Sequence, residues 1–435
     1  MYAAYKPLRN YLRGFNLWTG LGAVYFYMQH LGFNEPLPPQ LQTPKLRLGQ
    51  SPHRAGLFPH LVELMARELV LNADQRFGNP FRTATEAFKT MSLIHRLDDR
   101  YWGSYDNRSD DIIRHLSRLA FQQFPSQSPI ATGELARHKM LYTHPRVAPM
   151  IEAEFGMSTG ELFQIILLLA EELSHGPTPP FAFLHHVPDT MQDAATSLRA
   201  RISKSGTELR EILAARQSFG VNWAFSFNAM RQYPLIHAGN PASVICPSPT
   251  MLIRRLSDGL YFDLISADKG FGDAVGKSFE DYVGEAAEKI GERWLELLPE
   301  QTWGSPEKRS IDWIMSDNSG TMFVECKLAR LSIASQTDLA DSPALSKSLE
   351  RLAGHIGQTY ATLTDALNGQ YPHWKNDGRP IHPVVVTFYE WFHFGPFLHS
   401  ALHPLVVEEL ARRELDASLL ERHPFTVCSI SEFEA

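Results

Sequence analysis

Two short apolar runs decide the fold of this chain: Ser310-Ile-Asp-Trp-Ile-Met315 and Thr321-Met-Phe-Val-Glu-Cys-Lys327. Each run has the length and residue types of a β-strand. The segment between them, Ser316-Asp-Asn-Ser-Gly320, has the composition of a turn. The pattern therefore predicts a hairpin with Asp312 on its first strand and Glu325 on its second.

The second run contains the only Asp/Glu-x-Lys triplet in the 435-residue chain, Glu325-Cys326-Lys327. Residues two apart share a face of a strand, so we expect Glu325 and Lys327 to point the same way and Cys326 to point into the opposite layer. Such a triplet alone is also typical of a solvated cross-strand ion pair. With Asp312 one hairpin away, the pattern favours metal-assisted hydrolysis of a phosphodiester bond.

The ligand chemistry can be predicted from these residues. Mg²⁺ prefers hard oxygen ligands and usually retains several waters, so two carboxylates and one backbone carbonyl are an adequate protein contribution. Asp312 and Glu325 would supply the carboxylates, and Cys326 the carbonyl. Lys327 would orient the attacking water, assist its deprotonation or balance charge on the scissile phosphate, and the sequence does not choose among these roles.

A third acid precedes the hairpin. The stretch Gly276-Lys-Ser-Phe-Glu-Asp-Tyr-Val-Gly284 leads into a helical pattern and places Glu280 near a predicted helix start. There, Glu280 would support the metal site, and Asp281 is its competitor for the role. An acid in the first turn of a helix is also favoured by the helix dipole alone.

Further elements surround the hairpin in the sequence. A poorly marked strand is expected near Glu300-Gln-Thr-Trp303, ahead of the hairpin. After it, leucine and isoleucine residues between Leu345 and Leu367 recur with helical spacing, and His382-Pro-Val-Val-Val-Thr-Phe-Tyr389 has the composition of a buried strand. The order strand, crossover helix, strand predicts that the two strands pair in parallel.

In this order the elements resemble the PD-(D/E)xK nuclease superfamily, whose restriction endonuclease-like core is a helix, a three-stranded meander, a crossover helix and a strand. The resemblance covers roughly residues 270 to 430, and Ile311 stands where a Pro is expected before the first acid. In some branches of the superfamily a Gln on the crossover helix assists the site, which makes Gln358 the matching residue. An exposed helical Gln is the alternative interpretation.

Composition is that of a globular intracellular enzyme, and we expect a cytoplasmic protein without membrane attachment. Cys246, Cys326 and Cys428 are widely spaced, which argues against structural zinc and a disulfide framework. The longest apolar run, Leu162 to Ala170, is too short to span a bilayer and follows the capping-box pattern Ser158-Thr-Gly-Glu161, so it predicts a buried helix.

The two halves differ in charge and pattern. Residues 1–240 hold 24 Lys+Arg against 20 Asp+Glu, a net of +4, whereas residues 241–435 hold 17 against 28, a net of −11. We therefore expect an α-helical domain over 1–238, which would bind nucleic acid or a partner, and a nuclease-like domain with a mixed sheet over 239–435. Asp258-Gly259 between two β-rich runs predicts an accessory hairpin at about 249–265 in the second domain.

The resemblance implies an Mg²⁺- or Mn²⁺-dependent nuclease. DNA is the expected substrate because most members of the superfamily cut DNA, and bacterial defence against phage or mobile elements is the setting suggested by analogy. Two alternatives remain open: a non-catalytic nucleic-acid-binding or scaffold subunit, and a toxic effector that cleaves RNA. A homodimer, or a partner protein that gates the activity, would be compatible with any of these functions.

Overall fold

The computed structural model describes residues 2–44, 46, 51–103, 118–124, 129–178, 187–291, 294–329, 342–391 and 396–435. The chain divides into two compact units. Among the described residues, unit 1 contains those of 2–103 and Leu119–Phe271, and unit 2 contains Arg118 and those of Gly272–Ala435. The boundary therefore lies after residue 271 and not after residue 238, because the helices between these positions pack on elements of unit 1.

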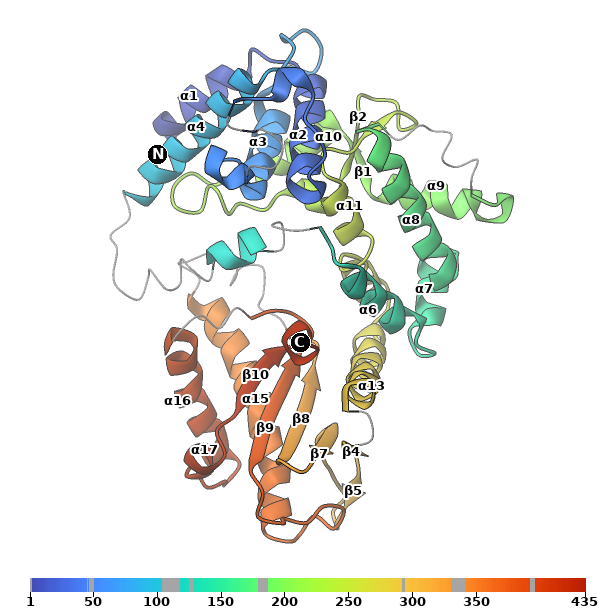
Figure 1. The fold of residues 1–435 in the computed structure, drawn as a ribbon, viewed down its shortest axis with the longest axis vertical. Helices are drawn as coiled ribbons and strands as arrows, with labels where there is room; N and C mark the ends of the chain where they lie inside the picture. The colour runs from blue at the N-terminus through green and yellow to red at the C-terminus, as the bar shows by residue number, and fades with distance from the viewer. Residues whose placement is uncertain are drawn as a thin grey trace. The chain divides into compact units, whose positions relative to one another are not determined.

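Unit 1 is mainly helical (Figure 1). Its α-helices are α1 (Tyr2–Leu12), α2 (Leu17–Phe33), α3 (Pro59–Asn72), α4 (Ala84–Trp102), α6 (Thr132–Thr143), α7 (Ala148–Phe155), α8 (Thr159–His175), α9 (Gln192–Arg201), α10 (Gly206–Ala215), α11 (Pro249–Arg255) and α12 (Leu260–Ala267). Short 3₁₀ turns are η1 (Pro39–Leu41), η2 (Pro52–Ala55), η4 (Asp189–Met191) and η5 (Ala229–Arg231). The core lies around α2 and α3, which contact each other extensively.

The predicted capping box before the longest apolar run is confirmed. The Ser158 side chain accepts a hydrogen bond from the backbone N–H of Glu161, and the Glu161 carboxylate accepts one from the N–H of Ser158. The run itself forms α8, whose Leu162, Ile166 and Leu169 are buried. In the part of the chain that the structure describes, no single helix is long and apolar enough to cross a membrane, and α7 and α8, bent by 62° at their break, meet that test only as a pair.

Unit 1 is not entirely helical, which corrects the prediction of an all-α first domain. Strands β1 (Ser203–Ser205), β2 (Leu235–His237) and β3 (Val244–Ile245) form a small sheet in which β1 and β2 are parallel and β2 and β3 are antiparallel. Each strand is only two or three residues long. Segments this short carry no recognisable alternation of apolar and polar residues.

The predicted accessory hairpin at 249–265 is wrong, since the segment forms the two helices α11 and α12. Ser248 caps α11 by accepting from the N–H of Met251, and Pro249 occupies the first turn. Gly259 has φ −67°, outside the left-handed region that a type I′ hairpin turn requires. A buried ion pair between Arg255 and Asp263, 2.8 Å apart, joins the two helices.

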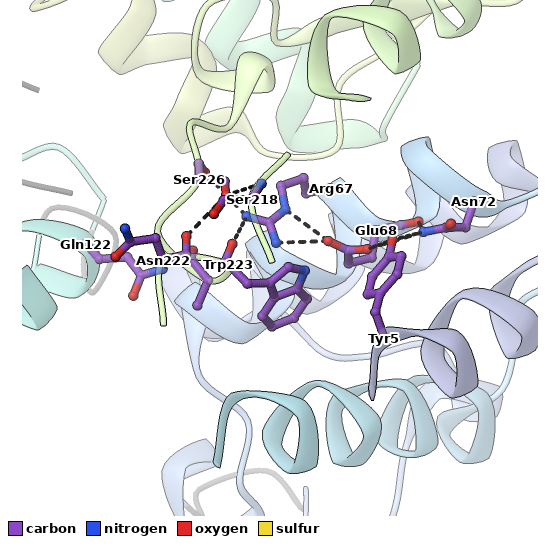
Figure 2. Close-up of polar contacts among 10 residues, drawn as sticks. Tyr5, Arg67, Glu68, Asn72, Gln122, Ser218, Asn222, Trp223 and Ser226 are labelled. Carbon is purple, nitrogen blue, oxygen red and sulfur yellow. Dashed lines mark hydrogen bonds and ion pairs between the residues drawn. The ribbon is translucent and has the colours of Figure 1, made fainter. Parts of the chain in front are cut away.

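A buried polar network connects α3 to distant segments of unit 1 (Figure 2). Arg67 and Glu68 are 2% and 0% exposed and form an ion pair of 2.9 Å. Glu68 also accepts from the Tyr5 hydroxyl at 2.5 Å and from the Asn72 amide at 3.2 Å. Arg67 donates to the carbonyl of Trp223 at 3.0 Å and lies over its ring. Both buried charges have partners, so the network fixes three regions of the chain together.

Unit 2 is built on a mixed five-stranded sheet in the order β10-β9-β8-β7-β4 (Figure 1). Strand β4 pairs antiparallel with β7, β7 antiparallel with β8, β8 parallel with β9, and β9 parallel with β10. The elements are α13 (Phe271–Gly291), β4 (Glu296–Pro299), β5 (Thr302–Trp303), β6 (Lys308–Arg309), β7 (Trp313–Ser316), β8 (Thr321–Lys327), α15 (Ser342–Leu367), β9 (Ile381–Thr387), α16 (Pro396–Arg412), α17 (Leu419–Arg422), β10 (Thr426–Ser429) and α18 (Ile430–Phe433).

The sheet confirms the main prediction for the C-terminal half. Strand β8 has the predicted bounds, Thr321–Lys327, and its partner across the crossover, β9, is parallel to it. Helix α15 connects them and packs on both strands, with Leu349, Leu352, Ile356 and Leu363 buried. The strand expected near residues 300–303 lies slightly earlier as β4, followed by the two-residue β5.

Candidate functional site

The hairpin register places Asp312 beside the end of strand β8. Trp313, the first residue of β7, pairs with Val324, so Asp312 lies opposite Glu325. The Oδ2 atom of Asp312 accepts a hydrogen bond of 2.6 Å from the backbone N–H of Cys326. Asp312 is 9% exposed. The backbone therefore fixes this carboxylate at the carboxyl end of β8, as the hairpin prediction required.

Lys327 lies between the two carboxylates. Its Nζ atom is 2.5 Å from Oε1 of Glu325 and 3.7 Å from Oδ2 of Asp312. Burial alone would lower the pKa of Lys327, but the attraction of Glu325 and Asp312 outweighs it and the pKa is raised. The ammonium is thus held charged between two acids, in the arrangement predicted for residues that share one face of the strand.

Glu325 is the most deeply buried acid of the group, with no exposed surface. Burial raises its pKa to about 8, the negative charge of Asp312 adds to the effect, and Lys327 opposes it. Apart from Lys327, no described residue donates a hydrogen bond to the carboxylate oxygens of Glu325. A buried carboxylate with so few donors is unfavourable, which is consistent with a site that a cation would complete.

Glu280 reaches the site from the middle of α13, not from a helix start, which corrects the predicted position. Trp313 positions it by donating from Nε1 to the Glu280 carbonyl at 2.9 Å. Gly284 permits this contact, because a Cβ there would lie 2.2 Å from the Trp313 ring. Burial raises the pKa of Glu280, and the charge of Asp312 acts in the same direction.

Lys277 is a neighbour of the site that the sequence analysis missed. It forms an ion pair with Glu280 and another with Asp281 at 3.1 Å. The Glu280 side chain is 14% exposed and that of Asp281 is 37% exposed, which makes Glu280 the more enclosed of the two competing acids. The spacing of Lys277 three residues before Glu280 is a signal that could have identified it.

Gln358 is half-buried on α15, and no hydrogen bond joins it to Asp312, Glu325 or Lys327 among the described side chains. Helix α16 packs against α15 at the neighbouring Gly357, since a Cβ there would lie 2.6 Å from Cγ of Glu409. Another α15 residue, His355, interacts electrostatically with Lys327. Burial lowers the pKa of His355 to about 4, and the charge of Lys327 acts in the same direction.

The donor set fits a hard divalent cation. Asp312 and Glu325 supply carboxylate oxygens, and among the described residues the buried oxygens of Glu325 have no hydrogen-bond donor other than Lys327. Across the residues that the structure describes, no group of three His, Cys, Asp or Glu side chains is already arranged around one point as a metal site. The three acids therefore do not form a closed cage, and Lys327 lies where a cation would balance the charge of Glu325.

The cysteines take no part in this chemistry as thiols. All three are free, and Cys326 is buried. Burial raises the pKa of the Cys326 thiol well above its usual range. Its role at the site is the backbone N–H that holds Asp312.

Comparison with protein-family models, curated proteins and solved structures gave no significant match. The interpretation of the site therefore depends on the geometry of these residues.

Proposed function

We propose that the chain is a metal-dependent nuclease with a restriction endonuclease-like catalytic unit. The observation that carries this proposal is the arrangement of buried Asp312 and Glu325 with half-buried Lys327 at the end of β8. Lys327 Nζ lies 2.5 Å from Glu325 and 3.7 Å from Asp312. Two acids and one lysine on adjacent strand ends combine cation binding with stabilisation of a phosphate.

The order of elements in unit 2 supports the same proposal. Helix α13 precedes the antiparallel strands β4, β7 and β8, helix α15 crosses over, and β9 adds in parallel to β8. This is the order of the PD-(D/E)xK core. Asp312 immediately precedes β7, Glu325 and Lys327 lie at the end of β8, and Glu280 lies on α13, an arrangement that supports the resemblance.

Each residue has a defined task in the proposed reaction. Asp312 and Glu325 would hold Mg²⁺ or Mn²⁺, and the carbonyl of Cys326 and the Glu280 carboxylate would support that shell. When bound, the cation supplies charge stabilisation for the phosphate and acidifies water. Lys327 holds its proton and orients the attacking water or neutralises charge on the phosphate, while Gln358 remains a secondary candidate on α15.

DNA is the proposed substrate, and defence against phage or mobile elements is the proposed setting, both on the resemblance alone. The buried ion pair also suits a second candidate, a non-catalytic nucleic-acid-binding subunit, because Lys327 neutralises the acids without any metal. Growth arrest with broken RNA and intact DNA would instead favour the toxic RNA-cleaving effector.

The test is cleavage of supercoiled, linear and single-stranded DNA and of RNA by wild type, Asp312→Ala and Lys327→Ala, with Mg²⁺, Mn²⁺ or EDTA. We expect cutting that requires metal and is lost in both variants. Equal cutting by the variants would refute this site. Binding without cutting by the wild type would favour the non-catalytic subunit.

A further inference from the structure

The loop between α3 and α4 in unit 1 exposes an aromatic side chain on an ordered backbone. Phe77 is 89% exposed. The carboxylate of Asp74 accepts from the backbone N–H of Arg76 at 2.6 Å and of Phe77 at 2.8 Å, which fixes the turn that carries the ring. Exposing a Phe side chain forgoes about 2 kcal/mol of burial. A single exposed ring is common on protein surfaces, so a binding site here depends also on the charged groups of the neighbouring segments.

Hydrogen bonds from the junction of α1 and α2 hold the backbone of this loop. The N–H of Asn79 donates to the carbonyl of Gly14 at 2.8 Å, and the N–H of Asn16 donates back to the carbonyl of Asn79 at 2.7 Å. Trp18 Nε1 donates to the carbonyl of Gln75 at 3.0 Å. The backbones touch at Gly78, where a Cβ would lie 2.2 Å from the carbonyl carbon of Phe15.

Four exposed cationic side chains lie on the Phe77 loop and on the segments joined to it. Edge-to-face aromatic contacts connect the segments, with ring centroids 5.3 Å apart for Phe15 and Phe81 and 5.0 Å apart for Tyr11 and Phe15. The ammonium of Lys89 lies 4.3 Å from the centroid of the Tyr11 ring. The cations are exposed, and none forms an ion pair with a residue that the structure describes; they are Arg13, Arg76, Arg82 and Lys89.

The acids of these segments do not neutralise the cations. Residues 2–16 and 74–89 contain only Asp74 and Glu86. Asp74 caps the turn below Phe77, and Glu86 accepts from the N–H groups of Arg82 and Thr83 at the start of α4. Both carboxylates therefore accept hydrogen bonds from backbone N–H groups, whereas the side chains of Arg13, Arg76 and Arg82 are exposed and that of Lys89 lies over Tyr11.

We infer that this surface, formed by Arg13, Arg76, Phe77, Arg82 and Lys89 and here called the Phe77 surface, binds single-stranded nucleic acid. An exposed ring on a rigid loop stacks a base, and cations around it contact the flanking phosphates. The inference depends on the proposed nuclease function, because it identifies how the chain holds its substrate. Residues 241–435 carry a net charge of −11, so phosphate binding requires a surface elsewhere.

The experiment measures fluorescence anisotropy of labelled single-stranded DNA and RNA with the full chain in EDTA, where no metal-dependent cutting occurs. We expect Phe77→Ala to weaken binding about 10-fold. We expect Arg76→Ala with Arg82→Ala to lower the slope of log Kd against log salt by about 1.4, or about 0.7 for each phosphate contact. Comparing the affinities for DNA and for RNA then identifies which nucleic acid the surface binds more tightly.

Matched controls separate this surface from general effects of exposure and charge. Phe33→Ala removes another exposed ring, which is 53% exposed. Lys139→Ala with Arg146→Ala removes two exposed cations elsewhere in unit 1. Both controls should bind as wild type does.

The inference would be overturned by any of three results. The Phe77 and Arg76/Arg82 variants could bind with wild-type affinity, the controls could lose as much affinity as these variants, or the wild type could fail to bind. Cleavage assays on the same proteins distinguish this failure from failure of the proposed function. A wild type that cuts while Phe77→Ala binds normally refutes only the Phe77 surface. If binding depends on the Phe77 surface but wild type and Asp312→Ala cut equally well, only the catalytic site is refuted.

Discussion

Replacing Glu325 with Gln should change how the stability of unit 2 depends on pH. Glu325 is fully buried, and its pKa is raised to about 8 in the folded chain. A folded-state pKa above the unfolded value of about 4.3 means that the folded chain binds the extra proton. The free energy of unfolding of the wild type therefore falls as pH rises through this window, and Glu325→Gln removes that loss.

The size of the effect follows from the two pKa values. Between pH 5 and pH 8, a carboxyl group that titrates near 8 when folded and near 4.3 when unfolded costs the folded state about 3 to 4 kcal/mol. The wild-type free energy of unfolding should thus fall by about 3 kcal/mol relative to Glu325→Gln over this range.

The assay is urea unfolding of both proteins in EDTA at pH 5, 6, 7 and 8, with amide exchange in β8 as the local measure of unit 2. Glu307→Gln, an exposed glutamate of the same unit, is the matched control and should show a pH-independent difference. A difference between wild type and Glu325→Gln that stays constant, or that grows in favour of wild type as pH rises, would refute the reasoning.

Two further predictions test the packing that positions the elements. Gly284→Ala should destabilise unit 2 by about 2 kcal/mol or more in urea titrations, because its Cβ would lie 2.2 Å from the Trp313 ring. Gly276→Ala on the same helix is the control: its Cβ would have no atom within 4 Å, so it should be neutral or slightly stabilising. Equal effects of the two substitutions would contradict the close approach at Gly284. Arg67→Ala should destabilise unit 1 by about 3 to 5 kcal/mol, since it leaves the 0%-exposed Glu68 without its cation, and Arg67→Met with Glu68→Gln should lose less. Thermal unfolding of single and double variants measures this, with exposed Arg96→Ala as the control, and a double variant less stable than Arg67→Ala would contradict the account.

The C-terminal half was predictable because local and long-range signals agree there. The run Thr321–Lys327 forms a strand with those bounds, since its apolar residues are continuous and Gly320 ends the turn before it. The helical spacing of Leu349, Leu352 and Ile356 matches the face that α15 buries. A strand, a long helix and a second strand then leave few alternatives to parallel pairing.

The errors arose where a local signal had two interpretations. Asp258-Gly259 indicated a hairpin turn, but Ser248 and Pro249 form an equally good helix start, and tertiary packing decides between them. Glu280 was placed at a helix start because Gly276 looked like a boundary, yet the helix continues through it from Phe271. Gly284 inside α13 reflects close packing against Trp313, which a single sequence does not reveal.

The chemical types at the site followed from the sequence, but its electrostatics did not. Register places Asp312 opposite Glu325, and that much follows from the hairpin. The burial of Glu325, the position of Lys327 between the two acids, and the pairing of Lys277 with Glu280 depend on how helices cover the sheet. The spacing of these residues places Lys327 near Glu325 and Lys277 near Glu280, but it does not predict how deeply packing buries them.

The measurement that tests the central claim most directly is the rate of nucleic-acid cleavage as Mn²⁺ is titrated into wild type, Asp312→Asn and Asp273→Asn. Asp273 is an exposed acid on α13 of the same unit, so its variant controls for the loss of one negative charge. The account predicts saturable, metal-dependent cleavage by wild type and Asp273→Asn, and none by Asp312→Asn at any Mn²⁺ concentration. Cleavage by Asp312→Asn with the wild-type metal dependence would contradict it.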